Sequence, residues 1–210
     1  MYVGRIVSVA RNREGRLAVM YRVSSRSFPN REAQIKTGAV SIVPKKGHEG
    51  DVFKNPYIAY NCVKIVGPVA VATNGSQTDP IAEKIAAGVP VRDAFASALL
   101  TLDYEKDQYN TPRIASAVAG RSKAGFLGVV REDGLEVCRF TLELGECYYV
   151  STYETNRVSI AQRGEFDAAD AQEGAKFILG RGVFSDMTNA VTSVCAMEKD
   201  DGFEIAVAQA

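Results

Sequence analysis

The stretch Asp103-Tyr104-Glu105-Lys106-Asp107-Gln108-Tyr109-Asn110-Thr111-Pro112-Arg113 lies in the middle of the chain, between a helical run and a second run of strands. It concentrates acids, bases, tyrosines and amide side chains in eleven residues. Pro112 disfavours the helical region at Thr111, so the preceding helix must end before this point. The stretch therefore marks the junction where helices give way to sheet, and its polar side chains predict a functional site there.

Two helices are predicted before the junction. Asp79-Pro80 is typical of a helix start, with Asp79 as N-cap and Pro80 at the first helical position, and Gly88 ends this helix. The second helix is predicted over 92–103, where apolar side chains recur with helical spacing: Phe95, Leu99 and Leu102. The short link between the helices indicates an antiparallel pair that lies over a sheet.

Strands are predicted on both sides of these helices. Before them the β-branched runs are 2–10, 17–23, 39–43, 57–66 and 69–73, and we expect residues 1–73 to form a first β layer. After them come strands over 114–119, 125–131, 135–142 and 147–152, a helix over 170–179, and a hairpin of 190–197 and 203–208. This order predicts an α+β fold, a four-layer α-β-β-α sandwich of two mainly antiparallel sheets in one domain, 1–210.

Composition limits the class of protein. Hydrophobic residues make up 46% of the chain and charged residues 24%, which is typical of a globular protein. No apolar run approaches the roughly 20 residues that a bilayer span needs. The N-terminus lacks the basic-then-apolar order of a signal peptide, so we expect a cytoplasmic protein without a membrane partner.

Metal and redox chemistry are not indicated. The four cysteines form no C-x-x-C pair, and we expect the three in strand-like runs to be buried thiols: Cys62, Cys138 and Cys147. His48 is the single histidine and lies in a loop, so neither a metal site nor a Ser–His triad is expected.

Charge is unevenly distributed although the net charge is zero. Residues 1–46 carry ten Lys and Arg against two Glu. This basic segment suits a phosphate-bearing small molecule, and it is equally compatible with a solvated face or a complementary interface in a homo-oligomer. Nucleic acid is not expected, because the aromatic residues do not interleave with the basic ones and the pI is about 6.6. Within this segment, the loop 24–31 offers hydroxyl and guanidinium donors for a phosphate, with an ordinary polar surface loop as the alternative.

The predicted layer order is similar to the N-terminal nucleophile (Ntn) hydrolase fold. That family needs Thr, Ser or Cys at the mature N-terminus, where the free amine acts as base. This chain starts Met1-Tyr2 instead, so we do not expect ordinary Ntn amidohydrolase chemistry.

One family combines an Ntn-like fold with the lack of an N-terminal nucleophile. The sequence resembles the archaeal-type IMP cyclohydrolases over its full length, through Tyr2-Val3-Gly4-Arg5, Tyr21-Arg22-Val23-Ser24-Ser25-Arg26-Ser27-Phe28-Pro29-Asn30-Arg31, Tyr60-Asn61, Thr73-Asn74-Gly75 and the junction quoted above. The resemblance implies an Ntn-like fold and ring closure of 5-formamidoimidazole-4-carboxamide ribonucleotide (FAICAR) to IMP, the last step of de novo purine synthesis. It implies no folate, nucleotide cofactor or metal.

The resemblance also implies site residues. Arg31, Tyr60 and Glu105 match catalytic positions of the family. Glu105 is the expected base, Tyr60 the donor to the formyl oxygen, and Arg31 the group that stabilises the oxyanion and lowers the pKa of Tyr60. The candidates for substrate binding are Ser25, Arg26, Asn74 and, more weakly, Arg113.

Each candidate has an ordinary structural interpretation. Asn74-Gly75 is also typical of a plain turn, and Arg113 of a partner for a junction aspartate. Tyr60 is also typical of a core aromatic, and Glu105 of a solvated acid beyond a helix end. Two other functions stay open at this point: an Ntn-fold amidohydrolase acting on a cyclic amide or nucleotide, and a nucleotide-binding protein without catalysis.

Overall fold

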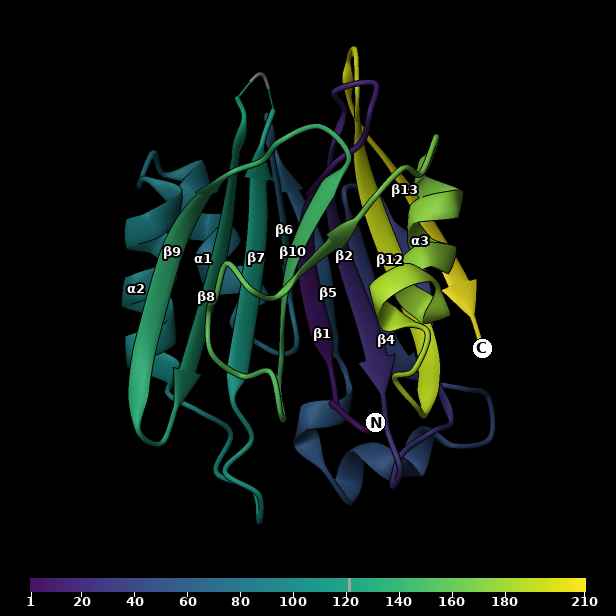
Figure 1. Cartoon of the computed structure of the whole chain (residues 1–210). Helices are drawn as coiled ribbons and strands as arrows, with labels where there is room; N and C mark the ends of the chain where they lie inside the picture. Colours follow the sequence, from purple (N-terminus) through teal and green to yellow (C-terminus); the bar gives the residue numbers. More distant parts are fainter. Residues whose placement is uncertain (121) are drawn as a thin grey trace.

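Two antiparallel sheets form the centre of the molecule (Figure 1). The computed structural model of the chain describes residues 1–120 and 122–210. The first sheet has the strand order β11-β10-β1-β2-β12-β13. Its strands are β1 (Ile6–Arg11), β2 (Leu17–Ser24), β10 (Glu146–Ser151), β11 (Arg163–Glu165), β12 (Ala190–Lys199) and β13 (Gly202–Gln209).

The second sheet has the order β3-β4-β5-β6-β7-β8-β9, so each strand pairs with its neighbours in sequence. Its strands are β3 (Arg31–Lys36), β4 (Ala39–Pro44), β5 (Tyr60–Val66), β6 (Val69–Thr73), β7 (Arg113–Ala119), β8 (Ala124–Arg131) and β9 (Gly134–Thr141). Short 3-10 turns are η1 (Glu49–Phe53), η2 (Pro56–Ile58) and η3 (Gly182–Phe184).

The helices cover the outer faces of the two sheets. α1 (Thr78–Ala86) and α2 (Val91–Leu102) contact one another and pack on the seven-stranded sheet. α3 (Ala171–Gly180) packs on β2, β12 and β13 of the other sheet, at the opposite side of the molecule (Figure 1). The predicted four-layer α-β-β-α sandwich is therefore confirmed, while its membership of the Ntn class stays a prediction.

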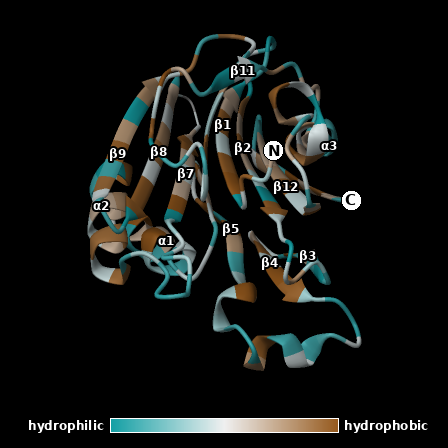
Figure 2. Ribbon diagram, turned by 60° about the horizontal axis from the view of Figure 1, so that its bottom comes forward, coloured by the Kyte–Doolittle hydropathy of each residue, from teal (hydrophilic) through white to brown (hydrophobic). Residues whose placement is uncertain are grey.

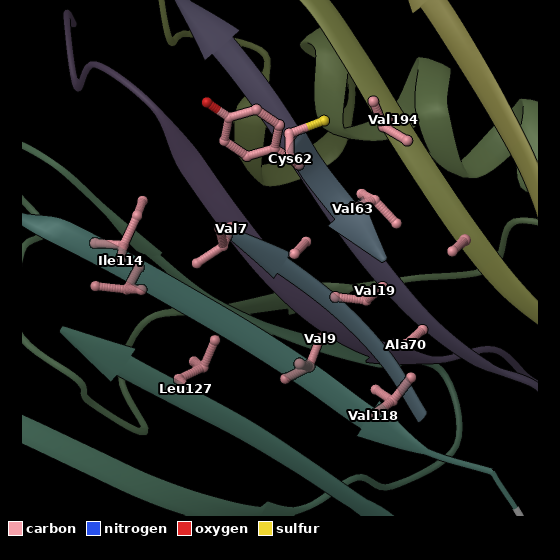
Figure 3. Close-up of a cluster of buried hydrophobic side chains, with 14 of the residues drawn as sticks. Val7, Val9, Val19, Cys62, Val63, Ala70, Ile114, Val118, Leu127 and Val194 are labelled. Carbon is pink, nitrogen blue, oxygen red and sulfur yellow. The ribbon is translucent and has the colours of Figure 1, made fainter. Parts of the chain in front are cut away.

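The hydrophobic core lies mainly between the two sheets. Figure 3 shows apolar side chains from both sheets meeting there, such as Val7 and Val19 from one sheet and Ile114 and Leu127 from the other. Two further clusters lie beneath α3 and beneath α1 and α2. Each sheet thus buries both faces, which explains why β1 and β2 are apolar along almost their whole length.

The expected single β layer of residues 1–73 is wrong. β1 and β2 belong to one sheet, and β3 to β6 belong to the other. The chain changes sheet through the polar loop 25–30. Strand propensity says that a segment is extended but not which partner it pairs with, so the sequence did not distinguish one sheet from two.

Several element bounds also differ from the prediction. β1 begins at Ile6 rather than Tyr2, and β5 at Tyr60 rather than Tyr57. α1 begins at Thr78 with Gln77 before it, so Asp79 is not the N-cap. Asp79 instead accepts a hydrogen bond from Asn61 on β5. Two strands were missed: β11, which has three residues, and β3, whose charged sequence fits an edge position.

Two burial predictions fail at exposed edges. Leu102 is exposed although Phe95 and Leu99 are fully buried, because α2 ends there and no longer faces the sheet. Cys138 lies on the edge strand β9 and is exposed, whereas Cys62 and Cys147 are buried as expected. None of the helices in the described ranges has the length and hydropathy that a bilayer span requires.

Leu99→Ala tests the packing of α2 on the sheet. The Leu99 side chain is fully buried, and an added Cβ on Gly128 of β8 would lie only 3.0 Å from its Cδ1 atom. We expect the truncation to lower the free energy of unfolding by about 2–5 kcal/mol in a urea titration. Leu100→Ala, next on the same helix and exposed, should change it by less than about 0.5 kcal/mol. Equal effects of the two variants would contradict this packing.

Candidate functional site

The predicted catalytic residues meet at one end of the sandwich. Arg31, Tyr60 and Arg113 are the first residues of β3, β5 and β7. Alternate strands of an antiparallel sheet run in the same direction, so these three residues lie at the same edge. The α2–β7 junction and residues 1–5 reach this end too, and Figure 2 shows the N-terminus and the start of β5 there.

Glu105 is the buried acid of the site. Only 1% of it is exposed, and its Oε2 accepts a hydrogen bond of 2.9 Å from Arg5 Nη2. Its Oε1 has no hydrogen-bond partner among the described residues and lies 3.9 Å from Arg113 Nη1. The interpretation of Glu105 as a solvated acid is therefore excluded, and one oxygen of its carboxylate is free to accept a proton.

Burial and two arginines act in opposite directions on the pKa of this carboxyl. Burial raises the pKa of Glu105, and the positive charges of Arg5 and Arg113 oppose that rise without cancelling it. Burial is the largest influence on the pKa of Arg5 and lowers it, but Glu105 and the nearby tyrosines Tyr60, Tyr21 and Tyr153 together outweigh burial, so the net shift is upward. A carboxyl group with a raised pKa and a free oxygen is suited to act as a general base near neutral pH.

The backbone of the junction keeps Glu105 in place. The amide N–H of Glu105 donates to the carbonyl oxygen of Thr111 at 2.8 Å, and Asp107 accepts hydrogen bonds from the backbone and hydroxyl of Thr111. Asp103 and Asn110 both adopt positive φ angles, 55° and 46°. The junction is thus a tight, internally bonded loop rather than an extended linker.

Tyr60 forms the second part of the site with Tyr21 of β2. Their hydroxyl oxygens are 2.5 Å apart, and their rings meet edge-on with centroids 6.4 Å apart. Burial raises the pKa of Tyr60, and the charge of Arg31 is the largest influence that opposes this. The expected effect of Arg31 on the pKa of Tyr60 therefore has the predicted direction, although burial leaves the net shift upward. Arg31 is itself buried and donates from Nε to the carbonyl oxygen of Phe28 at 3.0 Å.

Asn74 has a structural role at the edge of the site. Its side chain donates to the carbonyl of Pro112 at 2.9 Å and accepts from the amides of Ile114 and Gln77 at 2.8 and 2.7 Å. These bonds tie the end of β6 to the start of β7, so neither a plain turn nor a free substrate contact describes this residue.

Gly75 is required by close packing beside the acid. A Cβ at this position would lie 2.7 Å from both Arg113 Nη1 and Gln77 Oε1. Arg113 donates to that same Gln77 oxygen at 3.0 Å. Among the described residues Arg113 forms no ion pair with a junction aspartate: it bonds to Gln77 and lies beside Glu105, and Asp103 acts on it only weakly, through its charge.

A cavity of about 490 Å³ opens next to this cluster. Its wall includes residues from the N-terminus, the loop 25–28, the 3-10 segment and the junction: Tyr2, Arg5, Ser25, Ser27, Phe28, Lys54, Asn55, Pro56, Tyr57, Asp107, Gln108, Tyr109 and Tyr153. Arg5 lines the cavity and also binds Glu105, so it connects the open space to the buried acid.

The predicted binding residues Ser25 and Arg26 lie at this cavity. Ser25 lines it, and its hydroxyl oxygen accepts a hydrogen bond from the backbone of Phe28, which shapes the loop. The guanidinium carbon of Arg26 lies 4.1 Å from the centroid of the Tyr2 ring, another wall residue.

Sequence reasoning missed three residues of the site. Arg5 stands in a motif that carried the family resemblance, but nothing local distinguishes it from other arginines of the basic segment. Tyr21 lies inside an apolar strand, and this context predicts a core residue. Lys54 is one of several loop lysines. Their tertiary partners, Glu105 and Tyr60, reveal Arg5 and Tyr21, whereas Lys54 is found by its place in the cavity wall, where its ammonium pairs with Asp51 at 2.8 Å. Within the described residues there is no group of three His, Cys, Asp or Glu side chains that could hold a metal ion.

The buried carboxyl and the tyrosine pair beside a polar cavity are the groups that an enzyme using general acid–base chemistry would need. The chain belongs to the IMP cyclohydrolase-like protein family, whose model matches residues 2–202. Similar proteins named IMP cyclohydrolase occur in Methanosphaera stadtmanae (47% identical, 96% of each chain) and Methanococcus maripaludis strain S2 (45%, 98% of this chain and 99% of the relative). Another is from Methanocella arvoryzae (46%, 99% and 98%).

Arg5→Gln tests the ion pair at the centre of the site. We expect the pKa of Glu105 to rise further, because its main counter-charge is lost while its burial remains. A carboxyl with a raised folded-state pKa loses stability as the pH rises through that pKa. The variant should therefore unfold more easily by about 3 kcal/mol or more at neutral pH, with a smaller deficit in acid, where Glu105 is protonated.

The measurement is urea unfolding as a function of pH, together with carboxyl NMR of Glu105. Arg13→Gln is the matched control, because Arg13 pairs with Asp167 at 3.6 Å on an exposed surface. That control should cost less than about 1 kcal/mol. A loss of stability in Arg5→Gln that does not vary with pH would contradict the assignment.

Proposed function

We propose that this chain is an IMP cyclohydrolase, which closes the pyrimidine ring of FAICAR to give IMP and water. The observation that carries this is the Glu105 carboxylate, buried between Arg5 and Arg113, whose Oε1 accepts no hydrogen bond from the described residues. Family membership over residues 2–202 and the relatives named IMP cyclohydrolase support the same reaction.

Because the reaction is intramolecular, the protein has to supply only orientation, proton transfer and charge stabilisation. The carboxamide nitrogen of the substrate attacks the formyl carbon attached to the same imidazole ring. A site that holds the formamido group in one rotamer supplies most of the proximity. What remains is a base for the nitrogen proton and stabilisation of the charge that develops on the formyl oxygen.

The first half of the reaction forms the carbon–nitrogen bond. The nitrogen lone pair makes the new bond, and the π pair of the formyl group moves onto its oxygen. Glu105 takes the proton from the carboxamide nitrogen, and Tyr60 gives its proton to the formyl oxygen. Arg31 lies close enough to lower the pKa of Tyr60 and stabilises the negative charge left on that side of the site.

The second half removes water and restores the enzyme. The carbon–oxygen bond breaks, and the hydroxyl leaves with the proton that Glu105 had accepted. The former formamido nitrogen gives up its proton to Tyr60 as the ring double bond forms. Both side chains then return to their starting states, so these two residues balance the reaction, and we propose that it needs no folate, nucleotide cofactor or metal.

We assign the substrate phosphate to the mouth of the cavity. Ser25 and Lys54 line the cavity, and Arg26 stacks on the wall residue Tyr2, so they offer hydroxyl, ammonium and guanidinium donors there. In this structure the exposed Lys54 ammonium pairs with Asp51, at 2.8 Å. Arg113 is a neighbour of Glu105 rather than a mouth residue, which makes it a partner for the reacting end of the substrate. Asn74 supports the site through the backbone and is no longer proposed as a direct contact.

The remaining expectations stay proposals. We propose a single domain over 1–210, a cytoplasmic location, and a small-molecule nucleotide rather than nucleic acid as the partner. A homo-oligomer is supported only by the uneven charge, with ten Lys and Arg against two Glu in residues 1–46.

Glu105→Gln tests the proposed base. We expect kcat to fall by roughly 100-fold to 10,000-fold, because an amide cannot accept the carboxamide proton. The measurement is the ultraviolet change on conversion of FAICAR to IMP, with chelator and without folate. In the wild type, kcat/KM should decline as the pH falls through the raised pKa of Glu105, and this acid limb should be absent in the variant. Glu83→Gln, an exposed acid on α1, should match the wild type. A fully active Glu105→Gln enzyme would refute the role.

Lys54→Gln and Arg26→Gln test the phosphate assignment. Each should raise KM by about fivefold to tenfold with kcat nearly unchanged, because these contacts bind substrate and transition state equally. Lys36→Gln, an exposed lysine of edge strand β3 that does not line the cavity, is the control. A fall in kcat without a change in KM would place the phosphate elsewhere.

A further inference from the structure

The hydroxyl of Tyr21 is buried between the sheets with one partner. Tyr21 lies on β2 of the six-stranded sheet, is fully buried, and belongs to the central hydrophobic cluster. In the part of the chain that the structure describes, its hydroxyl is hydrogen-bonded only to the hydroxyl of Tyr60, which begins β5 of the other sheet, at 2.5 Å. The bond therefore crosses from one sheet to the other.

Burial decides which hydroxyl donates in this pair. If Tyr60 donated, the proton of Tyr21 would have no acceptor inside an apolar core, which is costly. If Tyr21 donates, its only proton is satisfied, and the proton of Tyr60 is left for another acceptor. Tyr60 is the partly exposed member of the pair, so its proton is the one that can meet a group outside the core.

The charges around the pair favour the same arrangement. Burial raises the pKa of Tyr60, whereas the positive charges of Arg31 and Arg5 lower it and the buried thiol of Cys62 raises it. Burial raises the pKa of Tyr21 well above its ordinary value, the charge of Tyr60 and the hydrogen bond to Tyr60 add to that rise, and the charge of Arg5 opposes it. The same bond lowers the pKa of Tyr60. Tyr21 thus keeps its proton, while Tyr60 is the member of the pair that can release one.

We propose that Tyr21 is a positioning residue for the cyclisation: by donating its hydroxyl proton to Tyr60, it points the proton of Tyr60 at the formyl oxygen and stabilises the Tyr60 oxygen after that proton has been transferred. This inference rests on the proposed function, and it adds a residue that never touches substrate. In the transfer, the Tyr60 O–H bond breaks, its electron pair stays on the Tyr60 oxygen, and the proton joins the formyl oxygen. Tyr21 remains protonated throughout.

Tyr21→Phe tests the proposal, because it removes one oxygen and keeps the ring that packs in the core. We expect kcat for FAICAR cyclisation to fall about fivefold to tenfold, the loss of one hydrogen bond, with KM unchanged. In the Tyr60→Phe background, Tyr21→Phe should cause no further loss, because it acts through the Tyr60 hydroxyl. Tyr148→Phe is the matched control: it is a core tyrosine whose hydroxyl donates to Glu146, and it should match the wild type.

A second readout does not depend on activity. With 3-fluorotyrosine placed at position 60 alone, the fluorine NMR signal reports ionisation of that hydroxyl. We expect its midpoint to move to higher pH when Tyr21 is replaced by Phe and to stay in place in the Tyr148→Phe protein. An unmoved midpoint, or equal losses of kcat in both backgrounds, would overturn the proposal. A wild-type protein that does not cyclise FAICAR would refute the proposed function instead, while a shifted midpoint in that protein would still establish the coupling of the two tyrosines.

Discussion

The ion pair between Arg5 and Glu105 joins two segments that lie a hundred residues apart in the chain. One precedes β1 of the six-stranded sheet, and the other leads into β7 of the seven-stranded sheet. Removing either partner would leave a buried charge without its counterpart, which proteins tolerate poorly. This contact can form only when the two sheets stack with their ends aligned, and the same alignment places the carboxylate beside the cavity.

Tyr21 and Tyr60 also connect the two sheets. Tyr21 belongs to the six-stranded sheet and Tyr60 to the seven-stranded sheet, and the hydrogen bond between their hydroxyl groups lies at the same end of the sandwich. The polar interior of this end contrasts with the apolar layer that fills the rest of the space between the sheets (Figure 3). Tyr60 is thus held at the start of a strand, and Glu105 in a junction loop that its own hydrogen bonds hold together, which suits a reaction that depends on orientation.

Much of the fold is visible in the sequence because local patterns decide it. Phe95 and Leu99 recur with helical spacing, and the apolar runs of β6 and β12 begin where predicted. Charged edge strands are harder to predict from the sequence, since β3 shows little of the alternation of apolar and polar residues that marks a half-buried strand. Asp79 was mistaken for a cap because its acceptor oxygens bind Asn61 and Lys64 of a neighbouring strand, which no local rule anticipates.

For the site, residue types and chain order by themselves indicated the polar junction, and the family resemblance selected Arg31, Tyr60 and Glu105. They did not indicate that Glu105 is buried, that Arg5 is its partner, or that Tyr21 bonds to Tyr60. Those facts depend on which strands share a sheet and how the two sheets face each other. Local propensity and spacing act over a few residues, whereas partners across a sandwich are chosen by the burial of the whole chain, so only the tertiary structure decided them.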